Sequence, residues 1–159
     1  FRDKSKLSSR TAKLVDIVCY CLNPNHFHIL LKQRAENGIS EFMKRLSGGY
    51  TQGFNFKYKR NGVLFQGKFK AKQINSNEYL LHVSVYVNLN NLVHRIKGDQ
   101  FRSSWEEYMG ESDKKLCDKN IILKQFKNKL EYRDFAESSL KNIHKRKDAL
   151  KELEAGLFE

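Results

Sequence analysis

Residues 14–32 read LVDIVCYCLNPNHFHILLK, and this stretch decides the fold class. Residues 14–22 are rich in β-branched and aromatic side chains, which is typical of a strand. Residues 26–32 have the same character, and Asn23-Pro24 between them is a turn signal. The stretch therefore predicts two strands joined in a tight β-hairpin.

Helical and strand signals alternate after the hairpin. Apolar residues at helical spacing follow Gly38, with Ser40 as a plausible N-cap: Ile39, Phe42, Met43, Leu46, Tyr50 and Phe54. Residues 63–74 alternate apolar and basic side chains, which predicts a strand with one basic face. A buried helix is expected over residues 77–90, opened by Ser76.

The C-terminal part of the chain carries mostly helical signals. A capping box at residues 103–107 predicts a short helix, and a second short helix is expected over 118–127. Residues 129–155 predict a long, charged helix. The order of elements favours an α+β fold, a ferredoxin-like antiparallel sheet with helices. We expect a basic loop or tail at 1–13, a core at 14–96 and a helical region at 97–159.

Composition restricts the partners. The 159 residues allow one domain, and a formal net charge of +12 points to a polyanion, with nucleic acid first and an anionic membrane surface second. No apolar run approaches the ~18 residues that span a membrane, so no membrane span is expected. The chain has three cysteines, an odd number that does not make a disulfide framework, and this favours a reducing cytoplasm.

Two histidines on the second strand are candidate metal ligands. His26 and His28 are two residues apart, so their rings project from one face. They could equally be structural histidines on a half-buried strand. If Asn23-Pro24 is a two-residue turn, Cys19 and Cys21 share that face and could complete a zinc site; a three-residue loop would place them on the opposite face. We favour a third interpretation, in which both cysteines fill the strand interior.

The helix at 77–90 offers a candidate nucleophile. His82, Tyr86 and Asn90 are spaced by four residues and are expected on one helix face. A tyrosine on such a helix is usually a core residue. Beside a strand that carries two histidines, it could instead attack a phosphodiester, helped by a metal ion that stabilises charge on the phosphate.

Three stretches carry a resemblance to a known family. NPNHFHILL (23–31) resembles the histidine-hydrophobic-histidine motif of the HUH-superfamily single-tyrosine transposases. GVLFQGKFK (62–70) resembles their second signature, and residues 79–90 resemble the helix with their catalytic tyrosine. The order and spacing match over about residues 14–96, and REP-associated and insertion-sequence transposases are the most similar types.

The resemblance implies a mechanism and a set of partners. His26, His28 and Asn90 would bind Mg²⁺ or Mn²⁺, and Tyr86 would attack single-stranded DNA to form a 5′-phosphotyrosine link. The substrates would be DNA ends with small hairpins, and no nucleotide cofactor would be needed. Enzymes of this kind occur as monomers and as homodimers, and the implied location is the nucleoid-associated cytoplasm.

Two departures from the family pattern qualify this expectation. The family domain starts with another strand and a helix, which are not legible here, so we expect a segment before Phe1. Asn91 follows Asn90 where relatives often have proline, which leaves the end of the helix open. His82 has no family role, and we treat it as structural.

Basic residues near the second signature predict the DNA-binding surface. They are Lys57, Lys59, Arg60, Lys68, Lys70 and Lys72. A solvated basic face is the alternative. Two rival functions also stay open. One is a domesticated DNA-nicking enzyme with the same chemistry; the other is a non-catalytic nucleic-acid-binding module held by zinc through the two cysteines and two histidines.

Overall fold

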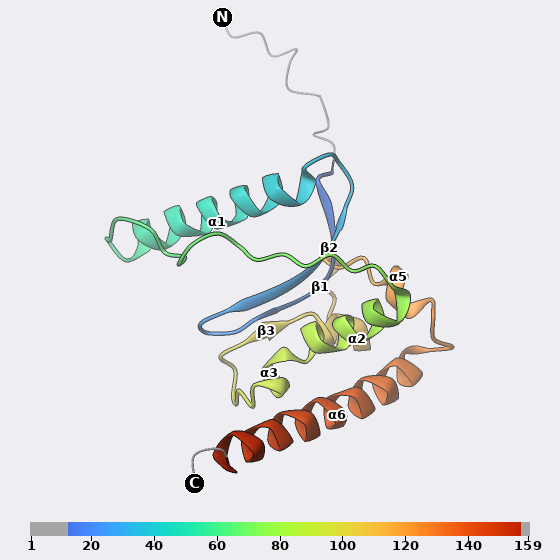
Figure 1. The fold of residues 1–159 in the computed structure, drawn as a ribbon. Coiled ribbons are helices and arrows are strands. Elements are labelled where there is room, and N and C mark those ends of the chain that lie inside the picture. The colour runs from blue at the N-terminus through green and yellow to red at the C-terminus, as the bar shows by residue number, and fades with distance from the viewer. Residues whose placement is uncertain (1–12, 157–159) are drawn as a thin grey trace, which may run out of the picture. The chain divides into compact units, whose positions relative to one another are not determined.

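The computed structural model describes residues 13–156, with the side chains described to residue 150. The predicted tail at 1–13 therefore lies almost entirely outside the described residues. The elements in chain order are β1 (Val15–Leu22), β2 (Phe27–Gln33), α1 (Gly38–Lys57), α2 (Asn77–Asn88), α3 (Asn90–Val93), β3 (Arg102–Ser103), α4 (Trp105–Met109), α5 (Asn120–Leu123) and α6 (Lys129–Gly156) (Figure 1). None of these helices is long and apolar enough to cross a membrane.

The predicted hairpin and the α+β fold class are confirmed. The three strands form an antiparallel sheet in the order β2-β1-β3. The backbone N–H of Asn23 donates to the His26 carbonyl at 2.9 Å, so the turn consists of Pro24 and Asn25. The turn therefore has two residues, but it lies one position later than the predicted Asn23-Pro24 turn. Strand β3, which pairs Ser103 with Cys21, was not predicted.

The described residues divide into two compact units. The first contains residues 13–16 and 32–71, and it includes α1. A Cβ at Gly38 would lie 2.3 Å from the Leu14 carbonyl oxygen, so only glycine fits at the start of α1. The helix begins after Asn37 rather than at Ser40, so the predicted N-cap is wrong: Gly38 and Ile39 already belong to the first turn.

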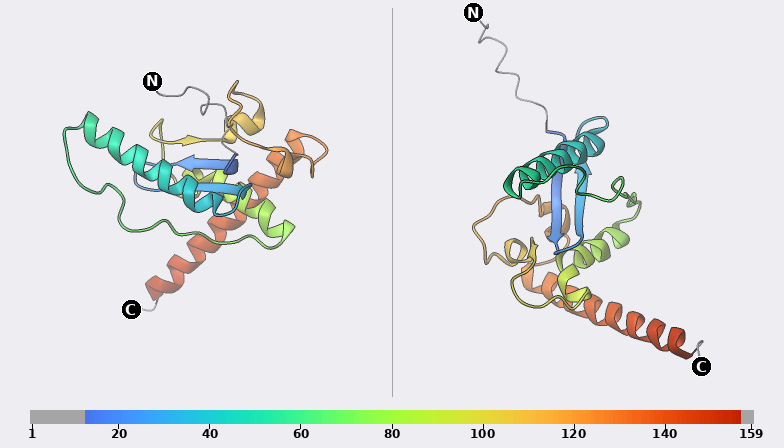
Figure 2. Two further views of the ribbon diagram at one scale, coloured as in Figure 1. Left: turned by 90° about the horizontal axis from the view of Figure 1, so that it is seen from above. Right: turned by 90° about the vertical axis from the view of Figure 1, so that its left-hand side faces the viewer.

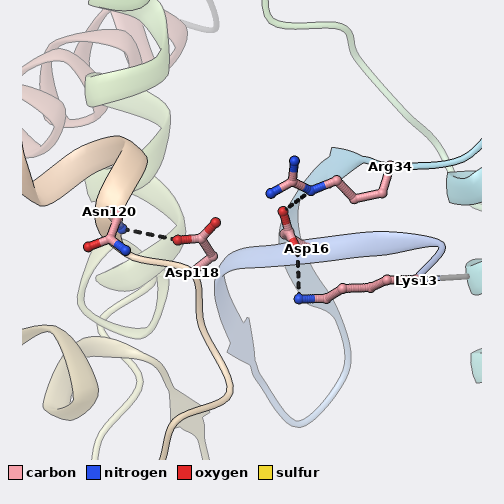
Figure 3. Close-up of polar contacts among 5 residues, drawn as sticks. All are labelled: Lys13, Asp16, Arg34, Asp118 and Asn120. Carbon is pink, nitrogen blue, oxygen red and sulfur yellow. Dashed lines mark hydrogen bonds and ion pairs between the residues drawn. The ribbon is translucent and has the colours of Figure 1, made fainter. Parts of the chain in front are cut away.

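A buried carboxylate marks the start of β1 in this unit. The side chain of Asp16 is only 3% exposed and lies between Lys13, at 2.6 Å, and the Arg34 guanidinium (Figure 3). The hydrogen bond from Lys13, together with Arg34, lowers the pKa of Asp16. Because the pKa of Asp16 is lowered on folding, its interactions with Lys13 and Arg34 stabilise the folded protein at pH values above the unfolded pKa of an aspartate, ~3.9. This contribution is lost as the pH falls through the pKa that Asp16 has in the folded protein.

The predicted strand at 63–74 is wrong, because no helix or strand lies between Lys57 and Asn77 in the structure. Gly67 has φ +84° in the middle of the segment, and Gly62 just before it has φ +90°. Both values lie outside the extended region that a strand requires. Val63 is 84% exposed, so its apolar side chain is not on a buried face.

The second unit contains residues 17–31 and 72–156. Helix α2 starts where expected, because the Ser76 hydroxyl accepts the Tyr79 backbone N–H. The helix predicted over 77–90 is interrupted at Leu89, which has φ −107°, and α3 continues from Asn90. Helix α6 matches the predicted long helix and packs against α2, α3 and α4 (Figure 2). Helix α5 is shorter than the predicted 118–127 segment.

Buried polar groups connect α2 to the rest of this unit. The Tyr132 hydroxyl of α6 accepts from Asn88 Nδ2 at 3.1 Å and lies 3.0 Å from Ser84 Oγ. Asn88 Oδ1 accepts from Ser104 Oγ at 2.6 Å, and Ser104 Oγ accepts the Tyr20 backbone N–H of β1 at 2.8 Å. Burial raises the pKa of Tyr132, so the phenol stays protonated. This network holds α2 between β1 and α6.

Replacing Tyr132 by Phe should lower the free energy of unfolding by about 1–3 kcal/mol, because Asn88 Nδ2 would lose its acceptor inside the core. The measurement is urea denaturation followed by circular dichroism. The exposed Tyr50→Phe is the matched control and should leave the midpoint unchanged. Equal midpoints for both variants would contradict a stabilising role of the network.

Candidate functional site

The second unit brings the two histidines of the hairpin to the tyrosine of α2. His26 ends the turn and His28 lies in β2, with ring centroids 5.4 Å apart in an edge-on arrangement. The His28 ring also lies edge-on to Tyr86, again 5.4 Å between centroids. Two stretches almost sixty residues apart in the sequence therefore meet, as the sequence analysis predicted.

Asn90 joins the same cluster from the first position of α3. Its side chain is fully buried, and its Oδ1 lies 3.1 Å from His26 Nε2. Because α2 ends at Asn88 and α3 starts two residues later, the interruption at Leu89 does not separate Asn90 from Tyr86. The three side chains predicted as metal ligands and the predicted nucleophile thus occupy one place in the structure.

Two asparagines also reach His26, Asn23 just before the turn and Asn25 within it, and neither was predicted as a site residue. Asn25 Oδ1 lies 2.7 Å from His26 Nδ1. Asn23 Nδ2 lies 3.0 Å from His26 Nε2 and donates to Asn90 Oδ1 at 2.7 Å. The motif Asn-Pro-Asn-His was interpreted only as a turn signal. The available clue was that one asparagine directly precedes the two-residue turn and the other lies within it, next to His26.

The contacts of His26 specify where its proton lies. An amide oxygen can only accept, so the contact with Asn25 places a proton on Nδ1, and in the neutral imidazole Nε2 then carries a lone pair. Asn90 Oδ1 is also an acceptor, and it faces this lone pair at 3.1 Å. The buried Nδ2 of Asn90 has no hydrogen-bond partner among the described residues. Two acceptor atoms that converge in this way suit a bound cation.

The donor set has the chemistry to hold a divalent metal ion. The side chains that converge are two imidazoles and one amide, and no group of three His, Cys, Asp or Glu side chains within residues 13–150 could hold a metal ion. Such a set leaves positions for phosphate oxygens and water, as phosphoryl chemistry requires. His26 and His28, with Asn90, are thus the residues that could hold Mg²⁺ or Mn²⁺.

A third histidine, His94, also lies next to His26. It follows α3, four residues after Asn90, and its ring centroid is 4.9 Å from that of His26. Burial, and then the neighbouring His26 and His94, lower the pKa of His28. Burial, and then Lys147, also lower the pKa of His94. Both shifts favour neutral imidazole, the form in which histidine binds a metal.

The cysteines are placed as interior side chains. Cys19 is fully buried, and its Sγ lies 3.8 Å from the Ser84 carbonyl of α2. Cys21 is also buried, and its thiol donates to Asn23 Oδ1 at 3.5 Å. Burial raises the pKa of both thiols, which disfavours the thiolate that zinc requires. This arrangement matches the third interpretation given above.

His82 does not belong to the site. Its ring packs on Phe135 of α6 with 5.2 Å between centroids, and Nδ1 lies 3.5 Å from Ser139 Oγ. These contacts with α6 are those of a structural residue, which is the role expected for His82 from the sequence.

The predicted DNA-binding residues are exposed, but they do not share a strand face. Lys57 ends α1, and Lys59, Arg60, Lys68 and Lys70 follow it in the segment without a strand. The Arg60 guanidinium lies over the Phe54 ring and donates to the Val63 carbonyl. Lys72 belongs to the second unit, and its Nζ lies 4.9 Å from the centre of the Tyr79 ring.

Comparison with known proteins agrees with this geometry. A family model described as Transposase IS200 like matches residues 7–90, which is more than half of the chain. The protein is thus a DNA-processing transposase by class, and it belongs to the IS200-like transposases of the HUH superfamily. Searches of curated proteins and of solved structures find no significant match. The predicted family is confirmed.

In protein treated with a chelator, His26 should carry its proton on Nδ1, because Asn25 Oδ1 can only accept. Long-range ¹H–¹⁵N NMR spectra distinguish the two ring nitrogens and would test this. Asn25→Ala should weaken the preference for this tautomer, while Asn61→Ala, in an exposed turn, should leave the spectrum unchanged. A proton on Nε2 in the wild-type protein would contradict the assignment.

Proposed function

We propose that this transposase is a metal-dependent single-strand DNA endonuclease and strand transferase. Tyr86 is the nucleophile, and His26, His28 and Asn90 bind Mg²⁺ or Mn²⁺. The substrates are single-stranded DNA ends that carry hairpins. The observation that carries the proposal is the meeting of Tyr86 with His28, at 5.4 Å between ring centroids, beside the contact of His26 with Asn90.

The chemistry is a transesterification. The Tyr86 oxygen loses its proton and forms a bond to the phosphorus, while the bond to the 3′-oxygen of the preceding nucleotide breaks and that oxygen becomes a hydroxyl. The product is a 5′-phosphotyrosine link, which a second 3′-hydroxyl can attack to join strands. The bond energy is conserved at both steps, so no nucleotide cofactor is consumed. A divalent ion bound at the histidines supplies charge stabilisation at the phosphate.

Tyr86 and its neighbours are suited to these roles. Tyr86 is only partly buried, whereas Tyr108 and Tyr132 are almost completely buried. Asn90 is held in place by Asn23, and His26 by Asn25, so the ligand atoms are oriented in advance. Positioning of this kind is what phosphoryl transfer chiefly needs from a protein.

Tyr86→Phe should abolish the covalent protein–DNA adduct while DNA binding is retained, because only the attacking oxygen is removed. Adduct is detected on a denaturing gel after incubation with Mn²⁺ and a labelled single-stranded hairpin substrate. Tyr79→Phe is the control: Tyr79 is the third residue of α2, seven residues before Tyr86, and its ring contacts Lys72. Adduct formed by Tyr86→Phe and lost in Tyr79→Phe would reverse the assignment.

We further propose that the exposed basic residues bind the DNA backbone: Lys57, Lys59, Arg60, Lys68, Lys70 and Lys72. The support is their exposure and charge alone, since the strand face predicted for them is absent. A solvated basic surface has the same appearance, so the salt dependence of binding must separate the two.

Changing Lys68, Lys70 and Lys72 together to Gln should reduce the log–log salt slope of single-strand binding by ~0.7 for each phosphate contact that is lost. Fluorescence anisotropy across a salt series measures the slope. The control is a triple Gln variant at Lys114, Lys115 and Lys124, which are exposed lysines in other segments. Equal slopes for the two variants would remove the first set from the DNA footprint.

The zinc-held binding module is the less supported rival. Cys19 faces the Ser84 carbonyl, and both thiols are buried in their neutral form. A protein of that kind would unfold and release zinc when both cysteines are replaced by Ala, whereas the proposed enzyme would keep its Mn²⁺-dependent cleavage. A domesticated nicking enzyme would share every residue and step proposed above, and genomic neighbourhood distinguishes it.

A further inference from the structure

We propose that Asn23 is an additional metal ligand, through its side-chain oxygen, in the site formed by His26, His28 and Asn90. The ligand class is a hard divalent cation, Mg²⁺ or Mn²⁺. This inference rests on the proposed function and extends it to a residue of the turn that precedes the histidines.

The position of the Asn23 side chain is the first argument. Its Nδ2 lies 2.7 Å from Asn90 Oδ1 and 3.0 Å from His26 Nε2, so one group touches both candidate ligand atoms. Those two atoms are 3.1 Å apart and both are acceptors. The Asn23 amide thus supplies the positive end of a dipole at the point on which the two lone pairs converge. A cation satisfies the same two atoms more strongly.

The surroundings of Asn23 accept either orientation of its amide. In the arrangement described, Asn23 Oδ1 accepts the weak hydrogen bond of the Cys21 thiol at 3.5 Å. A half-turn about the Cβ–Cγ bond would place Nδ2 against the Cys21 sulfur, which is also a weak acceptor, and Oδ1 toward His26 and Asn90. Rotation of the Asn23 amide therefore costs little free energy at Cys21, and it turns an oxygen ligand toward His26 and Asn90.

The backbone holds Asn23 at this place. Its N–H donates to the His26 carbonyl at 2.9 Å across the turn, so the two residues are paired at the end of the hairpin. Pro24 follows with a restricted φ, which limits the freedom of the turn. The side chain is partly buried, so water competes only partly for its oxygen. Asn23 is consequently positioned in advance, as a ligand must be.

The site would then offer two imidazole nitrogens and two amide oxygens. Oxygen ligands are those that Mg²⁺ and Mn²⁺ prefer, and a neutral amide adds no negative charge that would repel the DNA phosphate. The buried Nδ2 of Asn90, which has no partner among the described residues, belongs to the same cluster. With Asn23 the site would have two amide oxygens, whereas His26, His28 and Asn90 alone supply only one.

Mn²⁺ binding tests this without measuring activity. Free Mn²⁺ is titrated by electron paramagnetic resonance with the full chain, with Asn23→Leu, with Asn23→Asp and with the exposed control Asn61→Leu. We expect Asn23→Leu to bind about 10–100-fold more weakly, and Asn23→Asp to bind at least as tightly as wild type. Thermal unfolding checks that each variant is folded.

The Asp variant separates a ligand from a merely structural residue. A carboxylate cannot donate to Asn90 Oδ1 or His26 Nε2, so a structural role as hydrogen-bond donor would be lost in both variants. A ligand role would be lost only in Asn23→Leu. Equal weakening of both variants, or Asn23→Leu within twofold of wild type, would overturn the inference and leave the proposed function standing. Failure of the wild-type protein to bind Mn²⁺ would overturn both.

Discussion

The side chain of Asn88 is buried, and the positions of Tyr86 and Asn90 depend on the hydrogen bonds that it makes. It accepts from Ser104 and donates to Tyr132, and Ser104 in turn bonds the backbone of β1. Unpaired amides are costly in a core, so α2 has little freedom to rotate or slide. Because Asn88 stands between Tyr86 and Asn90 in the sequence, this restraint acts on both.

The hairpin supplies the other half of the site through a turn of only two residues. That turn brings Asn23 and His26 together, and each has a second partner in the cluster, Asn90 for both. The fixed hairpin and the fixed helix meet at His28 and Tyr86. The proposed nucleophile and the proposed metal-binding side chains are therefore held by different elements of one compact unit, which is how rigid elements orient reactive groups.

Much of this could be predicted from the sequence where a local rule dominates. The hairpin, the tyrosine helix and the long α6 follow from side-chain periodicity and turn chemistry, and the grouping of His26, His28, Tyr86 and Asn90 followed from the resemblance. The strand predicted over residues 63–74 is wrong because an alternating pattern of apolar and basic side chains does not determine the backbone conformation. Gly67 has a positive φ, which an extended strand does not allow. Asn23 and His94 were missed because their roles arise only when distant segments meet.

The hydroxyl that completes the Asn88 network comes from Tyr132, outside the region matched by the transposase family. Helix α6 also contributes buried Ala136 to the same core. The portion matched by the family model is consequently not a self-sufficient module. A fragment cut after α3 would expose the apolar side of α2 and leave the buried Asn88 amide without its partners. Any minimal version prepared for biophysical work should keep the first turns of α6, and exchange of C-terminal regions between relatives would need a hydroxyl at the same place.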